Sequence, residues 1–387
     1  MRDRAVASFR ARFGREPTVL VRAPGRVNLL GEHTDYNEGY VLPLAVDRAA
    51  WVAAAPLEEP LARVVALDLQ EEATFSLAPV PPRQGDWADY PRGVAWALAE
   101  RGAALVGMEA VLTSDVPQGA GLSSSAAIEV ACAWAWRTLS DLDLERTAVA
   151  LACQRAENGY VGVRCGVMDQ MASACGRADH VLLLDCRSLE IEPLPLPTGV
   201  AVVVADSGVR RELAASEYNR RRQECEEAVR LLSCHLPGIR ALRDVSAQDF
   251  ARLQYHLPAT LRRRARHVVG ENARVLKAVA ALRAGDLELV GRAMRRCHES
   301  LRDDYQVSAP ELDLLAETAW AVRGCYGARL TGAGFGGCIV ALAEAEAVEE
   351  LSARLAQAYQ ARFGRQPAVT VCRAAAGVAT IPWETSA

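Results

Sequence analysis

The 387-residue chain contains a single lysine, Lys277, although lysine and arginine together number 44. Lys277 lies in the helix-like stretch VLKAVAAL, with no glycine-rich loop beside it. Schiff-base enzymes, Walker-A ATPases and protein kinases all place a lysine next to substrate or phosphate. The sequence therefore disfavours these three classes, and any positive charge at a site must come mainly from arginine.

Other features are also scarce. No apolar run reaches about 18 residues, so we expect no membrane span, and residues 1–14 lack the apolar segment of a signal peptide. A net charge of −4 disfavours a general nucleic-acid binder. The eleven cysteines show no C-x-x-C spacing, which disfavours a zinc site or a disulfide framework. A reducing cytoplasm fits this cysteine usage best.

The chain is long enough for two domains with substantial cores, since 51% of its residues are hydrophobic. Short strand patterns fill residues 40–77, helical patterns cover 125–139 and 144–157, and the pattern is mostly helical from about 207 to 327. Strands and helices mix without strict alternation, which predicts the α+β class. The stretch EPLPLPTG is the best domain junction, so we expect domains at 1–185 and 186–387.

The segment PQGAGLSSSAAIEVA, residues 117–131, follows a predicted strand and runs into a predicted helix. Its glycines let the backbone approach a ligand closely, and successive N–H groups form a nest for an anion. Its three serines are expected to cap the helix and to offer hydroxyls to phosphate or metal. The pattern predicts a phosphate-binding loop more strongly than an ordinary serine-capped turn.

A second glycine-rich segment, LTGAGFGGCIVAL, matches G-x-G-x-x-G through Gly332, Gly334 and Gly337. A dinucleotide fingerprint follows a strand and opens a helix, whereas these glycines lead into the strand-like CIVAL. An NAD-dependent oxidoreductase is therefore disfavoured. A tight glycine turn without a ligand stays open as an alternative.

The segment RAPGRVNLLGEHTDYNEGYVLP, residues 22–43, gathers polar side chains beside glycines and turn formers. Carboxylates accept hydrogen bonds from hydroxyls, while histidine and arginine supply directional donors. This density predicts recognition of a polyhydroxylated ligand. A histidine such as His33, taken alone, would more simply be structural.

Two further carboxylates occur in QRAENGYVGVRCGVMDQMASACG. Glu157 lies at a helix end, and Asp169 lies among apolar and small residues, where a charge is costly unless it is paired or functional. Paired carboxylates also occur in glycosidases. Glycine-rich anion loops are not part of glycosidase chemistry, so that reading is disfavoured.

Three motifs in order, GRVNLLGEHTDYNEGYVLP, PQGAGLSSSAAIEVA and LTGAGFGGCIVAL, resemble those of the galactokinases of the GHMP kinase superfamily. The segments CGVMDQ, DCRSLE and SEYNRRRQECEE are also similar, so the resemblance runs from about Phe9 to the C-terminus. The first motif is the most specific, because mevalonate and homoserine kinases lack its long form. Ala333 stands where many relatives have glycine, which is tolerable if the position does not need a positive φ.

The resemblance implies a two-domain GHMP kinase fold with the active site in the cleft between the domains. It implies phosphorylation of the C1 hydroxyl of α-D-galactose, dependent on ATP and Mg²⁺, as the first phosphorylation step of galactose catabolism. The implied partners are the small molecules galactose and ATP, with no nucleic acid and no membrane; protein partners stay open.

The resemblance also implies residue roles. Asp169 and Arg26 would be catalytic, with Asp169 either a general base or a positioning group. The sugar would contact Glu32, His33, Thr34, Asp35 and Tyr218. The triphosphate would contact Gly119, Ala120, Gly121, Leu122, Ser123, Ser124 and Ser125. Ser125 and Glu157 would hold Mg²⁺, and Trp87 would either line the nucleotide pocket or be a half-buried residue at a helix entry.

Two alternatives stay open at this point. The chain could phosphorylate a related sugar, such as N-acetylgalactosamine, arabinose or galacturonate, because spacing in a sequence does not show pocket size. It could also be a non-catalytic sensor of galactose and ATP on the same fold, against which the intact Asp169, Arg26, Ser125 and Glu157 argue.

Overall fold

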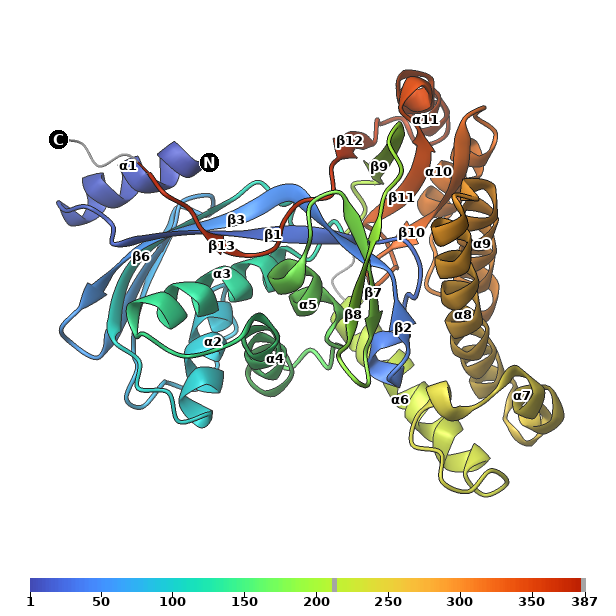
Figure 1. Cartoon of the computed structure of the whole chain (residues 1–387), viewed down its shortest axis with the longest axis horizontal. Helices are drawn as coiled ribbons and strands as arrows, with labels where there is room; N and C mark the ends of the chain where they lie inside the picture. The colour runs from blue at the N-terminus through green and yellow to red at the C-terminus, as the bar shows by residue number, and fades with distance from the viewer. Residues whose placement is uncertain (211–213, 384–387) are drawn as a thin grey trace.

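The computed structural model describes residues 1–210 and 214–383 of the chain. Three β-sheets and a larger set of helices form two halves that lie side by side (Figure 1). Within the described residues, no helix combines the length and the apolar character that crossing a membrane requires. The mixture of sheets and helices without strict alternation confirms the α+β class.

Six strands form the main sheet of the N-terminal half: β1 (Val19–Asn28), β3 (Pro43–Leu57), β4 (Leu61–Ala66), β5 (Glu71–Ser76), β6 (Gly107–Ser114) and β13 (Ala379–Thr380). Their order in space is β13-β1-β3-β6-β4-β5. Among these pairs only β4 and β6 run parallel.

Helices cover both faces of this sheet (Figure 1). One face carries α1 (Arg2–Phe13), which ends at Gly14 in a left-handed cap. The other face carries α2 (Asp89–Glu100), α3 (Ser124–Leu139), α4 (Arg146–Ala156) and α5 (Met168–Cys175). The alternation of β1 and β3 supports this arrangement, because Val19, Val21 and Val52 pack in one core and Leu20 and Ala53 in another.

The C-terminal half has an antiparallel sheet in the order β10-β11-β9-β12. Its strands are β9 (Val200–Asp206), β10 (Cys325–Thr331), β11 (Cys338–Glu344) and β12 (Ala368–Cys372). Its helices are α6 (Ala214–Leu232), α7 (Ala247–Leu253), α8 (Ala259–Ala284), α9 (Leu287–Ser300), α10 (Pro310–Trp320) and α11 (Val348–Phe363). Helices α9 and α10 pack on β10.

Short turns complete the set: η1 (Asp35–Asn37), η2 (Glu157–Val161), η3 (Leu242–Asp244), η4 (Gln254–His256), η5 (Leu301–Tyr305) and η6 (Ala345–Ala347). Of these, η2 and η5 are single wide turns of π-helix type, each of which continues an α-helix. Such turns often occur at functional sites.

A third, small sheet lies between the halves (Figure 1) and consists of β2 (Tyr40–Val41), β7 (His180–Asp185) and β8 (Ile191–Pro195). Its β7–β8 hairpin crosses the boundary that the sequence predicts at residue 185, and β8 uses part of the proline-rich stretch. After the C-terminal half, β13 returns to pair with β1, where Thr380 faces Val21. The chain therefore crosses between the halves more than once.

Two elements differ from the sequence prediction. Strand β3 is one strand of 15 residues, where the sequence predicts only short strands between residues 40 and 77. Strand β10 begins at Cys325 in a stretch predicted to be helical as far as 327. It is buried almost throughout, because α9 and α10 cover it, so its sequence lacks the alternation that marks a half-exposed strand.

A glycine contact sets the position of β10 on α9. A Cβ atom added to Gly291 of α9 would lie 1.9 Å from the Tyr326 carbonyl oxygen, and one added to Gly327 would lie 2.4 Å from the Gly291 carbonyl oxygen. Only glycine permits this approach between helix and strand. The contact matters for the site because Arg329, two residues further along β10, reaches into it.

We expect Gly291→Ala to lower the free energy of unfolding by about 1–3 kcal/mol, the usual cost of overpacking. The matched control is Gly270→Ala in α8, where the added Cβ would meet only the end of the flexible Arg274 side chain, at 3.1 Å. Because alanine is the better helix former, the control should raise stability by up to about 1 kcal/mol. Urea unfolding of both variants measures this, and equal effects would show that the α9–β10 contact is not limiting.

Candidate active site

Arg26 connects three segments of the N-terminal half. It follows a shift in the β1–β3 register between Pro24 and Arg26. Its Nε and Nη2 lie 2.8 and 2.7 Å from Asp169 Oδ1, and its Nη1 donates to the Gly121 carbonyl at 2.5 Å. Burial opposes the charge of Arg26, but Asp169 and Glu32 outweigh it and raise its pKa. The guanidinium is therefore fixed between α5 and the first glycine loop.

Asp169, in the first turn of α5, is held from two sides. Its Oδ1 accepts from Arg26, and its Oδ2 accepts from Ser123 Oγ at 2.5 Å. The expectation that Ser123 caps α3 is wrong, since this residue occupies the N-cap position but makes no capping bond. Its backbone is left-handed, with φ 57°, whereas a capping serine is normally extended, and its hydroxyl bonds to Asp169 instead.

A cavity of about 180 Å³ lies beside this pair, and we call it the sugar-side cavity. The structure brings four of the five residues predicted to bind the sugar to its wall: Glu32, His33, Asp35 and Tyr218. The wall also includes Arg26, Val163, Cys165, Met168, Asp169, Glu157, Gly332 and Ala333.

Thr34 does not line the sugar-side cavity. Its hydroxyl lies 2.7 Å from both the Gly31 and Tyr40 carbonyl oxygens and is buried. The side chain therefore shapes the turn that carries its neighbours, and a direct contact with a ligand does not fit this geometry.

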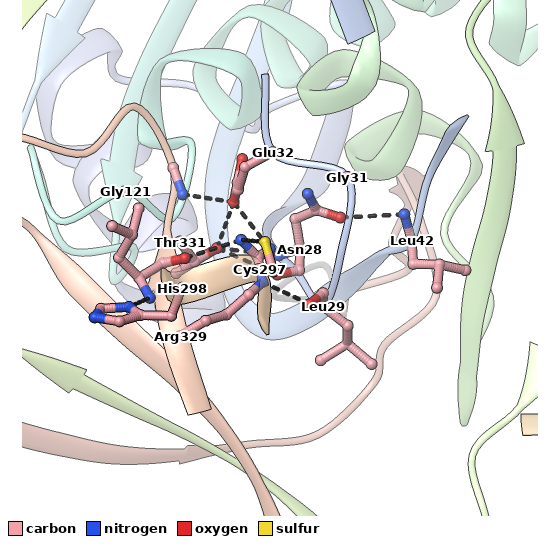
Figure 2. Close-up of polar contacts among 12 residues, drawn as sticks. Asn28, Leu29, Gly31, Glu32, Leu42, Gly121, Cys297, His298, Arg329 and Thr331 are labelled. Carbon is pink, nitrogen blue, oxygen red and sulfur yellow. Dashed lines mark hydrogen bonds and ion pairs between the residues drawn. The ribbon is translucent and has the colours of Figure 1, made fainter. Parts of the chain in front are cut away.

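Glu32 joins the two halves (Figure 2). Its Oε1 accepts from the Gly332 N–H at 2.8 Å and from Thr331 Oγ1 at 3.1 Å, and it pairs with Arg329 at 3.1 Å. Arg329 is completely buried and also donates to the carbonyls of Asn28 and Leu29. Arg329 is not among the site residues that the sequence predicts; the available signal was an arginine in the apolar run that precedes the second glycine loop.

His33 and Asp35 have strongly altered environments. Burial lowers the pKa of His33 well below its usual value, and His267 and Arg221 lower it further, so the ring is neutral at pH 7. His33 Nδ1 lies 2.8 Å from Tyr36 Oη, while Nε2 is buried without a hydrogen-bond partner. Burial raises the pKa of Asp35 to about 7, with Asp169 and Glu32 adding to the effect.

A second cavity, of about 230 Å³, lies on the other side of the first glycine loop, and we call it the loop-side cavity. Its wall combines apolar side chains with polar groups of the loop: Ala66, Asp68, Leu69, Trp87, Tyr90, Leu112, Ser114, Gln118, Gly119, Ser124, Ser125 and Ile128. The sequence left Trp87 either as part of the nucleotide pocket or as a half-buried residue at a helix entry. In the structure it is half-buried and lines the loop-side cavity.

The seven loop residues predicted to hold the triphosphate divide into two groups. Gly119, Ser124 and Ser125 line the loop-side cavity. The remaining four are directed elsewhere: Gly121 and Leu122 give their carbonyls to Arg26, Ser123 bonds to Asp169, and the Ala120 side chain is buried.

Ser125 and Glu157, the predicted metal ligands, are in contact. Ser125 Oγ donates to Glu157 Oε1 at 3.3 Å, and Gln170 Nε2 donates to Glu157 Oε2 at 2.6 Å. The same Gln170 amide lies 3.2 Å from Oε2 of Glu129, which is a buried carboxyl. Neither Gln170 nor Glu129 is among the site residues that the sequence predicts. Burial raises the pKa of Glu157 to about 7, with Asp169 adding to it, and raises that of Glu129 well above its usual value.

The two glycine loops meet backbone to backbone. A Cβ on Gly121 would lie 2.7 Å from the Thr331 carbonyl oxygen, and one on Gly332 would lie 2.9 Å from Gly121 Cα. Both glycines have a positive φ, 81° for Gly121 and 88° for Gly332, whereas Ala333 does not have a positive φ. Alanine at position 333 is therefore tolerated, as the sequence predicted.

Comparison with known protein families agrees with this arrangement. A model described as the galactokinase galactose-binding signature matches residues 7–56. Models described as the GHMP kinases N terminal domain and GHMP kinases C terminal match residues 89–177 and 278–361. The three matches contain the three motifs whose residues form the site.

Individual relatives match nearly the whole chain. The galactokinases of Roseiflexus sp. (strain RS-1) and Chloroflexus aggregans (strain MD-66 / DSM 9485) are 54% and 50% identical to it, covering 96% and 97% of this chain and 95% and 96% of theirs. The crystal structure of Lactococcus lactis galactokinase complexed with galactose superposes with a TM-score of 0.93 at 33% identity, covering 97% of this chain and 98% of that one.

More distant structures share the fold alone. The Methanococcus jannaschii mevalonate kinase superposes with a TM-score of 0.65 at 16% identity, covering 92% of this chain and 98% of that one. Its low identity contrasts with the half-identical, full-length match to the bacterial relatives above. On that match, and on the site that its motifs build, the chain belongs to the galactokinase family of the GHMP kinases.

Proposed function

We propose that this chain transfers the γ-phosphoryl group of ATP to the C1 hydroxyl of α-D-galactose, giving galactose 1-phosphate and ADP, the first phosphorylation step of galactose catabolism. One observation carries the proposal. Asp169 lines the sugar-side cavity and bonds to Ser123, and the next two residues of that loop line the loop-side cavity. Phosphoryl transfer depends mainly on holding acceptor and donor side by side in this way.

We assign sugar binding to Glu32, His33, Asp35 and Tyr218. Carboxylates accept hydrogen bonds from sugar hydroxyls, and the unpartnered Nε2 of His33 is free for one further bond. The Tyr218 ring lies 5.4 Å from the His33 ring and supplies an apolar surface beside the polar groups. Thr34 acts indirectly, through the turn it shapes.

Asp169 is the group that receives the C1 proton or orients the C1 hydroxyl for attack. Arg26 donates to its first oxygen, and Ser123 donates to its second oxygen, so the carboxylate is held in one orientation. The same guanidinium lies beside the first glycine loop, so it also places positive charge near the phosphoryl group in transfer. Because no lysine lies near the site, the protein's positive charge at the phosphoryl group would come from Arg26 and from the N–H groups of the loop.

The loop-side cavity is assigned to ATP, whose base would lie against Trp87, Leu112 and Ile128. Ser125 and Glu157 also fit Mg²⁺, which prefers oxygen ligands and takes only one or two from protein when phosphates supply the rest. Within the described part of the chain, no cluster of three or more His, Cys, Asp or Glu side chains forms an all-protein cage. When bound, the ion supplies positive charge to the phosphate oxygens.

Two broader assignments complete the proposal. The domains divide at about residue 185, with the site in the cleft between them, although β13 returns to the N-terminal sheet. The location is the cytoplasm, which is supported by eleven cysteines that are all free.

The direct test is a turnover assay with ATP and Mg²⁺ and a panel of sugars: galactose, N-acetylgalactosamine, arabinose, galacturonate and glucose. We expect galactose 1-phosphate from galactose and the highest kcat/KM for that sugar. Phosphorylation of another panel sugar in preference would assign the chain to that substrate. Binding of galactose and ATP without turnover would identify a sensor.

The first site prediction concerns Asp169. Asp169→Asn keeps the size and removes the charge, so we expect kcat to fall about 10²–10⁴-fold, with a much smaller change in galactose affinity. Asp244→Asn is the control, because Asp244 is also paired with an arginine, Arg187, but lies outside both cavities. Steady-state kinetics and melting curves of both variants separate a loss of turnover from a folding defect. A folded Asp169→Asn variant with normal kcat would remove Asp169 from the mechanism.

The second concerns Glu157. We expect Glu157→Gln to raise the Mg²⁺ concentration needed for half-maximal activity by at least about tenfold while galactose affinity stays the same. Glu129→Gln is the matched control: it contacts the same Gln170 amide, but its carboxyl does not contact Ser125. Equal losses of metal response and galactose affinity in Glu157→Gln would indicate a folding defect in place of a metal role.

The third concerns pH and Asp35. Its pKa of about 7 in the fold exceeds the ordinary 3.8, so between these values the folded state holds a proton that the unfolded state releases. Stability therefore falls as pH rises from about 4 to 7 and stays low above 7. In the absence of ligands, Asp35→Asn should raise the free energy of unfolding at pH 8 and raise it much less at pH 5. Urea unfolding at both values measures this, and a pH-independent difference would contradict it.

A further inference from the structure

A hydrogen-bonded chain runs from the sugar-side cavity into the C-terminal half. His33 Nδ1 lies 2.8 Å from Tyr36 Oη, Tyr36 Oη lies 2.7 Å from Tyr305 Oη, and Tyr305 Oη lies 3.1 Å from Cys225 Sγ. Tyr305 and Cys225 are buried, and they belong to η5 and α6, far from His33 in the sequence. Tyr36, Tyr305 and Cys225 do not line the sugar-side cavity.

Such a chain has only two possible directions, because each phenol carries one proton. Either both phenol protons point towards His33, or both point towards Cys225. In the first case Tyr36 donates to the imidazole nitrogen and Tyr305 donates to Tyr36 Oη; in the second Tyr36 donates to Tyr305 Oη and Tyr305 donates to the sulfur. An imidazole nitrogen is a good acceptor and a cysteine sulfur a weak one, so the first direction is favoured.

The thiol end agrees with this direction. Burial raises the pKa of Cys225 to about 11, so the sulfur keeps its proton and has an S–H to donate to Tyr305. The 3.1 Å distance between Cys225 Sγ and Tyr305 Oη permits a hydrogen bond in which the thiol donates and the phenol oxygen accepts.

We propose that Cys225, Tyr305 and Tyr36 form a relay that holds neutral His33 as its Nε2–H tautomer, so that the unpartnered Nε2 donates a hydrogen bond to an oxygen of the bound sugar. This inference rests on the proposed function and deepens it. Tyr36, Tyr305 and Cys225 are positioning residues, since they act through His33 and do not line the cavity.

The relay has a consequence for recognition. Glu32 and Asp35 offer acceptors to the sugar, so each needs a hydroxyl proton. His33 in the Nε2–H form instead needs a lone pair, and one sugar oxygen can then donate to a carboxylate while it accepts from His33. With the other tautomer, the His33 nitrogen would compete with the carboxylates for the same protons.

The first test is nitrogen-15 NMR of the imidazole nitrogens in the free protein. The chain has six histidines, and comparison with His33→Gln assigns the His33 signals. We expect one tautomer, with the proton on Nε2 and none on Nδ1. A protonated Nδ1, or a mixture of tautomers, would overturn the proposal. This readout needs no substrate, so it stays valid even if the chain proves not to phosphorylate galactose.

The second test uses Tyr36→Phe, Tyr305→Phe and the double variant. Tyr36→Phe should mix the His33 tautomers and raise KM for galactose about three- to tenfold, the loss of one hydrogen bond, while kcat changes less. Tyr305→Phe should act in the same direction but less. Because both act through one histidine, the double variant should be no worse than Tyr36→Phe alone, and additive losses in KM would overturn the relay.

The matched control is Tyr359→Phe. Tyr359 is likewise buried, and its hydroxyl donates to the Ser207 carbonyl at 2.6 Å, away from His33. This variant should lower the melting temperature as much as Tyr305→Phe does and leave the His33 signals and KM unchanged. A shift of the His33 signals or of KM in the control equal to that in Tyr305→Phe would show that any buried hydroxyl has this effect, and the relay would be abandoned.

Discussion

The buried charge of Arg329 is the constraint on which the site depends. A guanidinium with no exposed surface is tolerated only when its donors are satisfied and its charge is balanced. Arg329 meets both needs through Glu32 and the carbonyls of Asn28 and Leu29, all of which belong to β1 or the loop after it (Figure 2). The ion pair therefore fixes that loop against β10, and with it the orientation of His33 and Asp35 over the cavity.

A second constraint is the supply of positive charge without lysine. Arg26 is planar and always charged, and its fork divides between Asp169 and the Gly121 carbonyl, so one side chain fixes both Asp169 and the first glycine loop. A lysine could supply the charge but could not hold two partners in fixed directions. The close backbone contact of Gly121 and Gly332 then brings the second glycine loop to the same place, so each half contributes backbone to one site.

The site residues that could be predicted are those with a distinctive local sequence pattern. The residues whose role depends on contacts with distant parts of the chain could not be predicted. Asp169 could be predicted because a carboxylate among apolar residues is costly unless it is paired or functional. The glycine-serine loop could be predicted because its composition is rare. Arg329 acts on Glu32 across 297 positions of sequence, and no local pattern reveals such a pair. Ser123 was assigned to the helix start because serine usually caps, but tertiary contact with Asp169 decides its conformation. Strand β10 was missed for a similar reason, since burial on both faces removes the period of two.

The site gathers negative charge beyond what its arginines neutralise. Glu32, Asp35 and Asp169 share a cavity of about 180 Å³ with Arg26, while Arg329 is occupied by Glu32 from behind. Asp35 has no such partner, and its raised pKa of about 7 records the cost of holding it ionised. In the proposed function, hydroxyl groups of the bound sugar would relieve that cost by donating to the carboxylate. Stability is thus reduced at Asp35, a residue that we assign to sugar binding, as expected where selection acts on binding more than on stability of the empty protein. The rigid ion pair of Glu32 and Arg329 provides the support that allows Asp35 to stay in this unfavourable position.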